Sequence, residues 1–215
     1  MMASANDPVR SLRLVVADSD VRLRKELCQE LRGAGYRVVT EAEEGCEAVM
    51  HARGLRPDLV VMAGAMQGMD GIAAAEILHR ERIAPVVLLL DDSNDSNDSD
   101  GRSHLEFVRR AVRAGVVGMV HRPFQIATLR PVIETGRGRW VIERDQERRL
   151  QRLQAKEETR VVVEAAKEVL IAACGMSETR AYRTLQLRSM NTRRPLKEVA
   201  QAVLDTYHQQ PPVSS

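Results

Sequence analysis

Short apolar runs alternate with amphipathic segments along the first 125 residues. The apolar runs lie at residues 12–16, 37–40, 59–62, 86–90 and 117–120. Between them, apolar residues recur at helical spacing near residues 21–34, 45–54, 71–81 and 103–114. Strands that are apolar throughout are buried on both faces, which requires helices on both sides of a parallel sheet. The pattern therefore predicts an α/β fold over residues 11–125, a flavodoxin-like doubly wound sheet of five parallel strands.

Three short apolar stripes at helical spacing follow in the last third of the chain. The first stripe covers residues 162–173 and stops before Gly175, a residue type that ends helices without steric cost. Ser177 offers an N-cap hydroxyl for the second helix, and Pro195 suits the first position of the third. We expect a small all-α domain of three helices at residues 159–207.

Residues 126–158 join the two regions and are highly charged, with sparse apolar positions. Gly136 and Gly138 interrupt the pattern. We interpret this segment as a long, coiled-coil-like connector helix that extends the last helix of the sheet domain. Trp140, Leu150 and Leu153 are the candidates for a dimer seam, with Trp140 expected to be partly exposed as an interface anchor. The apolar residues of this segment follow a heptad repeat poorly, so a solitary charged helix is the alternative.

Composition adds a difference in charge between the two halves. Residues 1–125 hold 16 Lys and Arg against 19 Asp and Glu, a net charge of −3, and residues 126–215 hold 16 against 11, a net charge of +5. A basic helical half suits an anionic partner. The three scattered cysteines indicate a reducing compartment, and no apolar run approaches membrane-spanning length, so we expect a cytoplasmic protein without membrane contact. Residues 1–10 and 208–215 are expected to be a disordered lead and tail.

An acidic, repetitive run occupies residues 91–101. In the register of an EF-hand loop, Phe107 would stand where the bidentate glutamate is needed. We interpret the run as a solvated loop, and we expect no metal and no cofactor.

The helical region resembles the ANTAR family of transcription antitermination regulators. The resemblance rests on VEAAKEVLI at 163–171, SE at 177–178, AY at 181–182, Leu185, SM at 189–190, RR at 193–194, Leu196 and VA at 199–200. Glu168 replaces the family's usual glycine, and Ser189 stands where alanine is common. The resemblance implies an RNA-binding module that recognises paired hairpin loops in nascent transcripts.

The basic residues of this region are the expected RNA contacts, namely Lys167, Arg180, Arg183, Arg188, Arg193 and Arg194. Arginine pairs with phosphate through two N–H groups and stacks on unpaired bases, which suits hairpin loops. Lys167 is expected on the polar side of the first helix. Tyr182 shares a register with Ala181 and Leu185, so we expect it to pack in the core.

The first 125 residues resemble the receiver domain of bacterial response regulators. The resemblance rests on four segments: VVADSD at 15–20, PDLVVM at 57–62, MQGMDG at 66–71 and RPF at 122–124. Receiver chemistry needs an acceptor aspartate, an acidic pair for Mg²⁺, a hydroxyl and a lysine. The corresponding positions here hold Ala63, Asp18 with Ser19, Leu90 and Arg122. We therefore expect a pseudo-receiver that cannot be phosphorylated at the usual position, and no catalysis. Asp70 is expected to stabilise a turn.

The combined interpretation is an antitermination regulator that binds tandem hairpins in leader transcripts and so acts on RNA polymerase indirectly. We expect a homodimer controlled by a regulatory protein or a ligand on the pseudo-receiver, or by abundance. A DNA-binding response regulator, a protein-interaction adaptor and a working phosphorelay receiver are the alternatives.

Overall fold

The computed structural model describes residues 11–91 and 102–208, which form two compact units divided between Glu143 and Arg144. The predicted lead, the rest of the acidic run after Asp91 and the end of the predicted tail lie outside the described residues. The elements, in chain order, are β1 (Arg13–Ala17), α1 (Val21–Gly33), β2 (Arg37–Ala42), α2 (Gly45–Leu55), β3 (Leu59–Ala63), α3 (Gly71–Arg80), β4 (Val86–Leu90), α4 (Arg102–Arg113), β5 (Val116–His121), α5 (Ile126–Cys174), α6 (Glu178–Thr192) and α7 (Leu196–His208).

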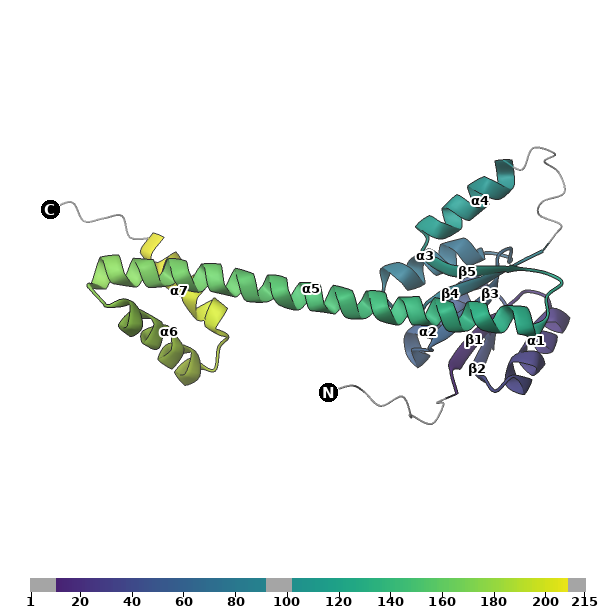
Figure 1. Ribbon diagram of the computed structural model, residues 1–215, viewed down its shortest axis with the longest axis horizontal. Coiled ribbons are helices and arrows are strands. Elements are labelled where there is room, and N and C mark those ends of the chain that lie inside the picture. Colours follow the sequence, from purple (N-terminus) through teal and green to yellow (C-terminus); the bar gives the residue numbers. More distant parts are fainter. Residues whose placement is uncertain (1–10, 92–101, 209–215) are drawn as a thin grey trace. The chain divides into compact units, whose positions relative to one another are not determined.

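The first unit is built on a parallel sheet with the strand order β2-β1-β3-β4-β5 (Figure 1). Each neighbouring pair is parallel, and β1 lies between β2 and β3. The predicted fold class is confirmed, and the strands begin and end within two residues of the predicted bounds. The prediction succeeded because β3 and β4 are buried at every position, as strands covered on both faces must be.

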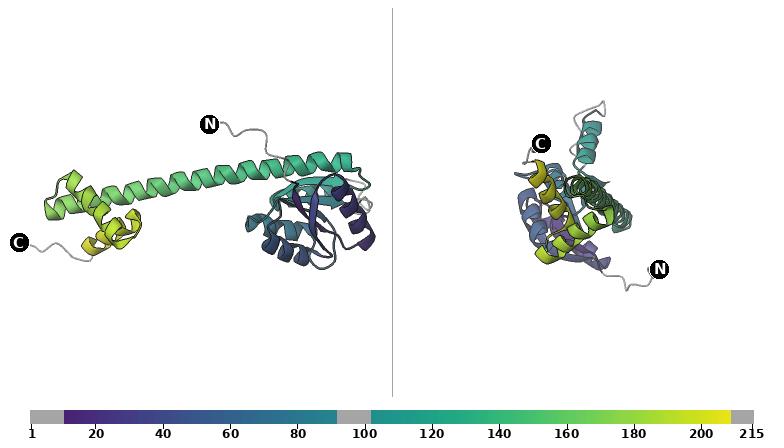
Figure 2. Two further views of the ribbon diagram at one scale, coloured as in Figure 1. Left: turned by 90° about the horizontal axis from the view of Figure 1, so that it is seen from below. Right: turned by 90° about the vertical axis from the view of Figure 1, so that its left-hand side faces the viewer.

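Alternate residues of each strand supply two separate cores. Val15, Met62 and Leu88 point to one face, where α2, α3 and α4 pack. Leu14 and Leu89 point to the other face, which α1 and the first part of α5 cover (Figure 2).

Helix α5 contains 49 residues and takes in both the predicted connector and the first helix of the predicted three-helix domain. We expected Gly136 to interrupt this segment, but the structure places it inside the helix, against β5. A Cβ at Gly136 would lie 2.6 Å from Val117 Cγ2, so the missing side chain lets α5 approach the sheet closely. The glycine reflects packing between α5 and β5 rather than a helix end.

Trp140 lies in the first unit and is 7% exposed. Its ring packs edge to face with that of His79, with centroids 5.7 Å apart. The expectation of a partly exposed interface anchor was wrong, because α3 covers the indole. Leu150 and Leu153 are exposed, so their part in a dimer seam stays a prediction.

The second unit packs α6 and α7 against the end of α5. Its core consists of Val163, Ala166, Leu170, Ala181, Leu185, Val199, Ala200 and Val203. Ser177 caps α6 as predicted, since its Oγ accepts a hydrogen bond from the Arg180 N–H. Alanines at the contacts allow short helices to approach closely.

Among the described residues, none of the helices combines the length and the apolar character needed to cross a membrane.

The two glycines of α5 give a matched pair of substitutions. We expect Gly136→Ala to lower the free energy of unfolding by roughly 1–3 kcal/mol, because the new methyl group meets the rigid side chain of Val117. Gly138→Ala meets nothing within 4 Å, so its better helix propensity should raise stability by up to about 1 kcal/mol. Urea unfolding of the full chain measures both changes. Equal effects of the same sign would contradict the close approach.

Candidate functional site

The residues that correspond to receiver chemistry gather at one edge of the sheet. Asp18 and Ser19 follow β1, Ala63 and Leu90 end β3 and β4, and Arg122 follows β5. Since all these strands are parallel, their carboxyl ends share that edge. The five positions that the sequence analysis assigned to receiver chemistry therefore lie at one edge of the sheet.

The carboxylate of Asp18 is buried and fully engaged. Its Oδ1 accepts a hydrogen bond from the Asp20 N–H at 2.9 Å, and its Oδ2 pairs with Nη2 of Arg122. Nη1 of the same guanidinium lies 3.1 Å from Asp91 Oδ1. Arg24 donates to the Asp18 backbone carbonyl at 2.5 Å. Arg122 thus supplies the countercharge that a buried carboxylate requires.

The other groups at this edge offer no replacement for the missing ligands. Asp20 caps α1, accepting from the Arg22 and Leu23 N–H groups at 2.8 and 3.1 Å, and these bonds lower the pKa of its carboxyl group. Ala63 is buried and has no side-chain oxygen. A Cβ at Gly64 would lie 3.0 Å from Leu90 Cδ2, so the neighbouring space is apolar.

These residues do not fit the Mg²⁺ ion that receiver domains use. The one buried carboxylate is paired with arginine, and the acceptor and hydroxyl positions carry alkyl groups. Across residues 11–91 and 102–208, no three His, Cys, Asp or Glu side chains converge as a metal site would require. Asp70 caps α3 through the Ala73 N–H at 2.7 Å, which confirms the predicted turn-stabilising role.

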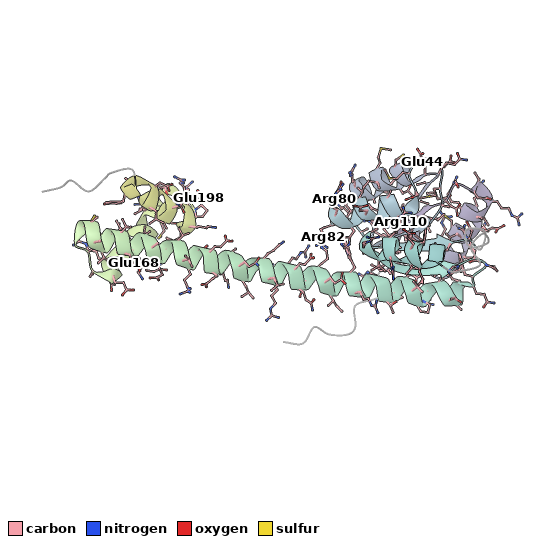
Figure 3. The ribbon with its side chains drawn as sticks, turned by 90° about the horizontal axis from the view of Figure 1, so that it is seen from above. Glu44, Arg80, Arg82, Arg110, Glu168 and Glu198 are labelled. Carbon is pink, nitrogen blue, oxygen red and sulfur yellow. The ribbon has the colours of Figure 1, made fainter. Side chains whose placement is uncertain are left out.

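A second candidate site lies in the helical unit, where exposed arginines occur along α6 and in the turn that follows it. The side chains of Arg180, Arg183, Arg188 and Arg193 are exposed, and none forms an ion pair with any other residue that the structure describes. Arg194 pairs with Glu198 at 3.1 Å, and both groups are more than half exposed. Glu198 lies on the surface of this unit (Figure 3). A solvent-exposed pair of this kind contributes little and exchanges readily for another anion.

Arg193 occupies an unusual backbone conformation. It caps α6 with φ of 53° and ψ of 30°, in the left-handed region where glycine or asparagine is preferred. Its N–H donates to the Ser189 and Met190 carbonyls, and the Arg194 N–H also reaches the Ser189 carbonyl. Arg56 caps α2 in the same left-handed conformation, so the backbone of Arg193 does not by itself mark a functional residue.

Lys167 does not lie where the sequence suggested. It is 7% exposed, and its Nζ donates to Glu164 and Glu178 at 2.8 and 2.7 Å. These hydrogen bonds raise the pKa of the ammonium group and lower the pKa of the Glu178 carboxyl group. Lys167 therefore joins α5 to the start of α6, and we no longer count it among the exposed cations.

Tyr182 was expected in the core, but it is 40% exposed. It borders a surface groove of about 410 Å³ in the helical unit. The groove is lined by Lys156, Thr159, Arg160, Val163, Glu164, Lys167, Tyr182 and Leu196. An aromatic ring beside cationic side chains is suited to hold an unpaired base with its phosphate. The alternation of core and surface residues along α6 gave no signal for this groove, because α5 and α7 form its other walls.

Comparisons with known proteins agree with this division of the chain. Residues 14–134 match the model of the response regulator receiver domain, and residues 151–204 match that of the ANTAR domain. Over 194 residues, 90% of each protein, the chain is 36% identical to the transcriptional regulatory protein PdtaR of Mycobacterium tuberculosis. A protein-glutamate methylesterase/protein-glutamine glutaminase of Myxococcus xanthus is 30% identical over 57% of this chain and 33% of its own length.

Among solved structures, the signal receiver domain of a modulated diguanylate cyclase from Desulfovibrio desulfuricans is similar. The TM-score is 0.53 and the identity 25%, covering 62% of this chain and 98% of that one.

The ion pair between Asp18 and Arg122 leads to a prediction about metal and stability. We expect Mg²⁺ to leave the midpoint of thermal unfolding unchanged, since both Asp18 oxygens are engaged. Asp18→Asn should lower the free energy of unfolding by roughly 3 kcal/mol, because the largely buried guanidinium group of Arg122 would lose its buried carboxylate partner. Ser19→Ala, at an exposed neighbour, is the control and should stay within about 0.5 kcal/mol. A rise in midpoint with Mg²⁺ would show that Asp18 exchanges arginine for metal.

Proposed function

The chain belongs to the response regulators that carry a receiver domain and an ANTAR domain, and from this membership we propose that it regulates transcription by binding RNA. The proposed target is a pair of tandem hairpins in a leader transcript. Binding would hold the RNA in a form that prevents a terminator hairpin, so that RNA polymerase continues. No chemical step is required of the protein.

The observation that carries this proposal is the series of exposed guanidinium groups along α6 and in the turn that follows it. Arg193 caps the C-terminal end of α6, and Arg180 and Arg183 are exposed in its first two turns. Arginine reads hairpin loops by pairing with phosphates and stacking on splayed bases. The Tyr182 groove adds an aromatic surface beside two further cations, Lys156 and Arg160.

We further propose that control does not pass through phosphorylation at the end of β3. Ala63 has no oxygen to accept a phosphoryl group, and Arg122 neutralises Asp18 internally. A regulatory protein or a ligand on the receiver surface, or the amount of protein, would set activity instead. A phosphoryl adduct mapped to that edge of the sheet after treatment with a small phosphodonor would refute this part.

A homodimer would present two helical units to two hairpins. Linking two binding events raises the effective concentration of the second without new contacts. Leu150 and Leu153 are the remaining candidates for the seam, since both are more than half exposed on α5.

Two other functions give different outcomes in one experiment. A DNA-binding regulator should shift duplex DNA in preference to a two-hairpin RNA, and an adaptor should shift neither. The turn between α6 and α7 favours RNA, because it is arginine-rich and leads into α7, whose apolar side is used in the core.

We expect Arg193→Ala combined with Arg194→Ala to weaken binding of a two-hairpin leader RNA. Each lost phosphate contact on a single strand should reduce the slope of log K against log salt by roughly 0.7. Titrations over a range of salt concentrations, with Arg37→Ala and Arg80→Ala in the receiver as the control pair, measure this. An unchanged slope and affinity would remove Arg193 and Arg194 from the site.

Two substitutions of Arg193 separate an effect on the stability of the protein from an effect on RNA binding. Arg193→Gly and Arg193→Ala remove the same guanidinium, so both should lose the same RNA affinity. Glycine accepts a φ of 53° without strain, so Arg193→Gly should be more stable than Arg193→Ala by about 1 kcal/mol. If RNA affinity instead follows stability across the two variants, the side chain has no direct role.

A further inference from the structure

The part of α5 within the helical unit has its charges separated by sign. We define the cationic face of α5 as Arg149, Arg152, Lys156 and Arg160, which fall within about 80° of arc at about 100° per residue. The acidic residues of the same stretch, listed from the N-terminal end, are Glu147, Glu157, Glu158, Glu164 and Glu168. They lie from about 60° to about 180° away from Arg149 on the helix. Asp145 stands at the N-terminal end of the cationic face.

Most of the positive charge on this face is uncompensated. Arg149, Arg152 and Lys156 are exposed and have no ion-pair partner within residues 11–91 and 102–208. Arg160 pairs with Glu157 at 2.7 Å, but its side chain is 67% exposed, so the pair is weak. Glu158, the next acid, is held by Lys197 of α7 at 2.6 Å. A helix that is stabilised by ion pairs on its own surface would instead place acidic and basic residues four positions apart.

The cationic face is continuous with the groove beside Tyr182. Lys156 and Arg160 belong to both, since they line the groove together with Tyr182. From Arg149 to Arg160 the face extends about 16 Å along the helix, at about 1.5 Å per residue. That length spans several phosphates on one strand of a nucleic-acid duplex.

We propose that the cationic face of α5 binds the phosphates of the hairpin stem, while the groove and the turn between α6 and α7 take the loop. This inference rests on the proposed RNA-binding function and extends the site into the segment that the sequence assigned to the connector. A stem begins where its loop ends, so a site that holds the loop places stem phosphates beside it. Duplex RNA is contacted chiefly through its backbone, which requires positive charge at intervals and no base readout.

A dimer seam on α5 would border the cationic face. The exposed apolar residues nearby, Leu150, Leu153 and Val161, lie about 100°, 40° and 120° from Arg149 around the helix. A seam through Leu150 and Val161 would leave the cationic side chains uncovered, whereas Leu153 lies directly beside them.

The test combines a protein variant with a change in the RNA. The full chain and the variant Arg149→Gln, Arg152→Gln, which leaves the groove residues Lys156 and Arg160 in place, are titrated with a two-hairpin RNA that has long stems. They are also titrated with an RNA that has the same loops on stems trimmed to the few closing pairs. We expect the variant to lose roughly fivefold in affinity for the long-stem RNA and to show a salt slope shallower by about 1–2. For the trimmed RNA, variant and unchanged chain should bind alike.

The control removes two exposed cations from the first unit, by Lys25→Gln and Arg80→Gln, and so makes the same change in net charge. It should bind both RNAs as the unchanged chain does. Equal binding of the long-stem RNA by variant and unchanged chain overturns the stem contact and leaves the proposed function standing. An equal loss on both RNAs also overturns it, because the cations would then act on the loop or through the overall field. If the unchanged chain binds neither RNA, the proposed function itself fails.

Discussion

One helix has to complete two hydrophobic cores. At its start, α5 buries Leu129 and Ile133 against the sheet, and at its end it buries Ala166 and Leu170 against α6 and α7. A shift of one residue would turn either apolar stripe by about 100° away from its core. The positions of Gly136 and the apolar residues are therefore fixed at both ends. The stretch between the two cores is free of this constraint, and it carries the charged residues.

The receiver site is held by charge that comes from the chain itself. A buried carboxylate such as Asp18 is costly without a countercharge, and a bound metal or a side-chain cation can supply it. Here Arg122 does so and also reaches Asp91. Because Arg122 is part of the chain, this countercharge does not bind or dissociate in response to a signal, as a metal ion can. The ion pair therefore supports the fold of the domain, in line with the proposal that a signal acts on another part of its surface.

The sequence was sufficient where the structure depends on local pattern. Strand positions follow from apolar runs, and Ser177 is a cap because of its own neighbours. The predictions failed where a partner comes from elsewhere in the chain. Trp140 is buried by His79, Lys167 by acids on two helices, and Tyr182 is exposed because α5 and α7 form a groove beside it. Helical periodicity gives the side of a helix on which a residue lies, but it does not give the neighbouring element.

The two units differ in whether their polar side chains are paired within the fold. In the receiver, Asp18 is paired with Arg122 and Asp20 caps a helix. In the helical unit, the exposed guanidinium of Arg193 has no ion-pair partner among the described residues, and Tyr182 is 40% exposed. Exposed cationic and aromatic side chains of this kind are available to a nucleic-acid ligand. Under the proposed function, a signal received by the first unit would alter RNA binding only if its ligand distinguishes two states of the protein. Because Ala63 has no side-chain oxygen to phosphorylate, we propose that a regulatory protein or a ligand on the receiver surface supplies that difference, unless abundance alone sets activity.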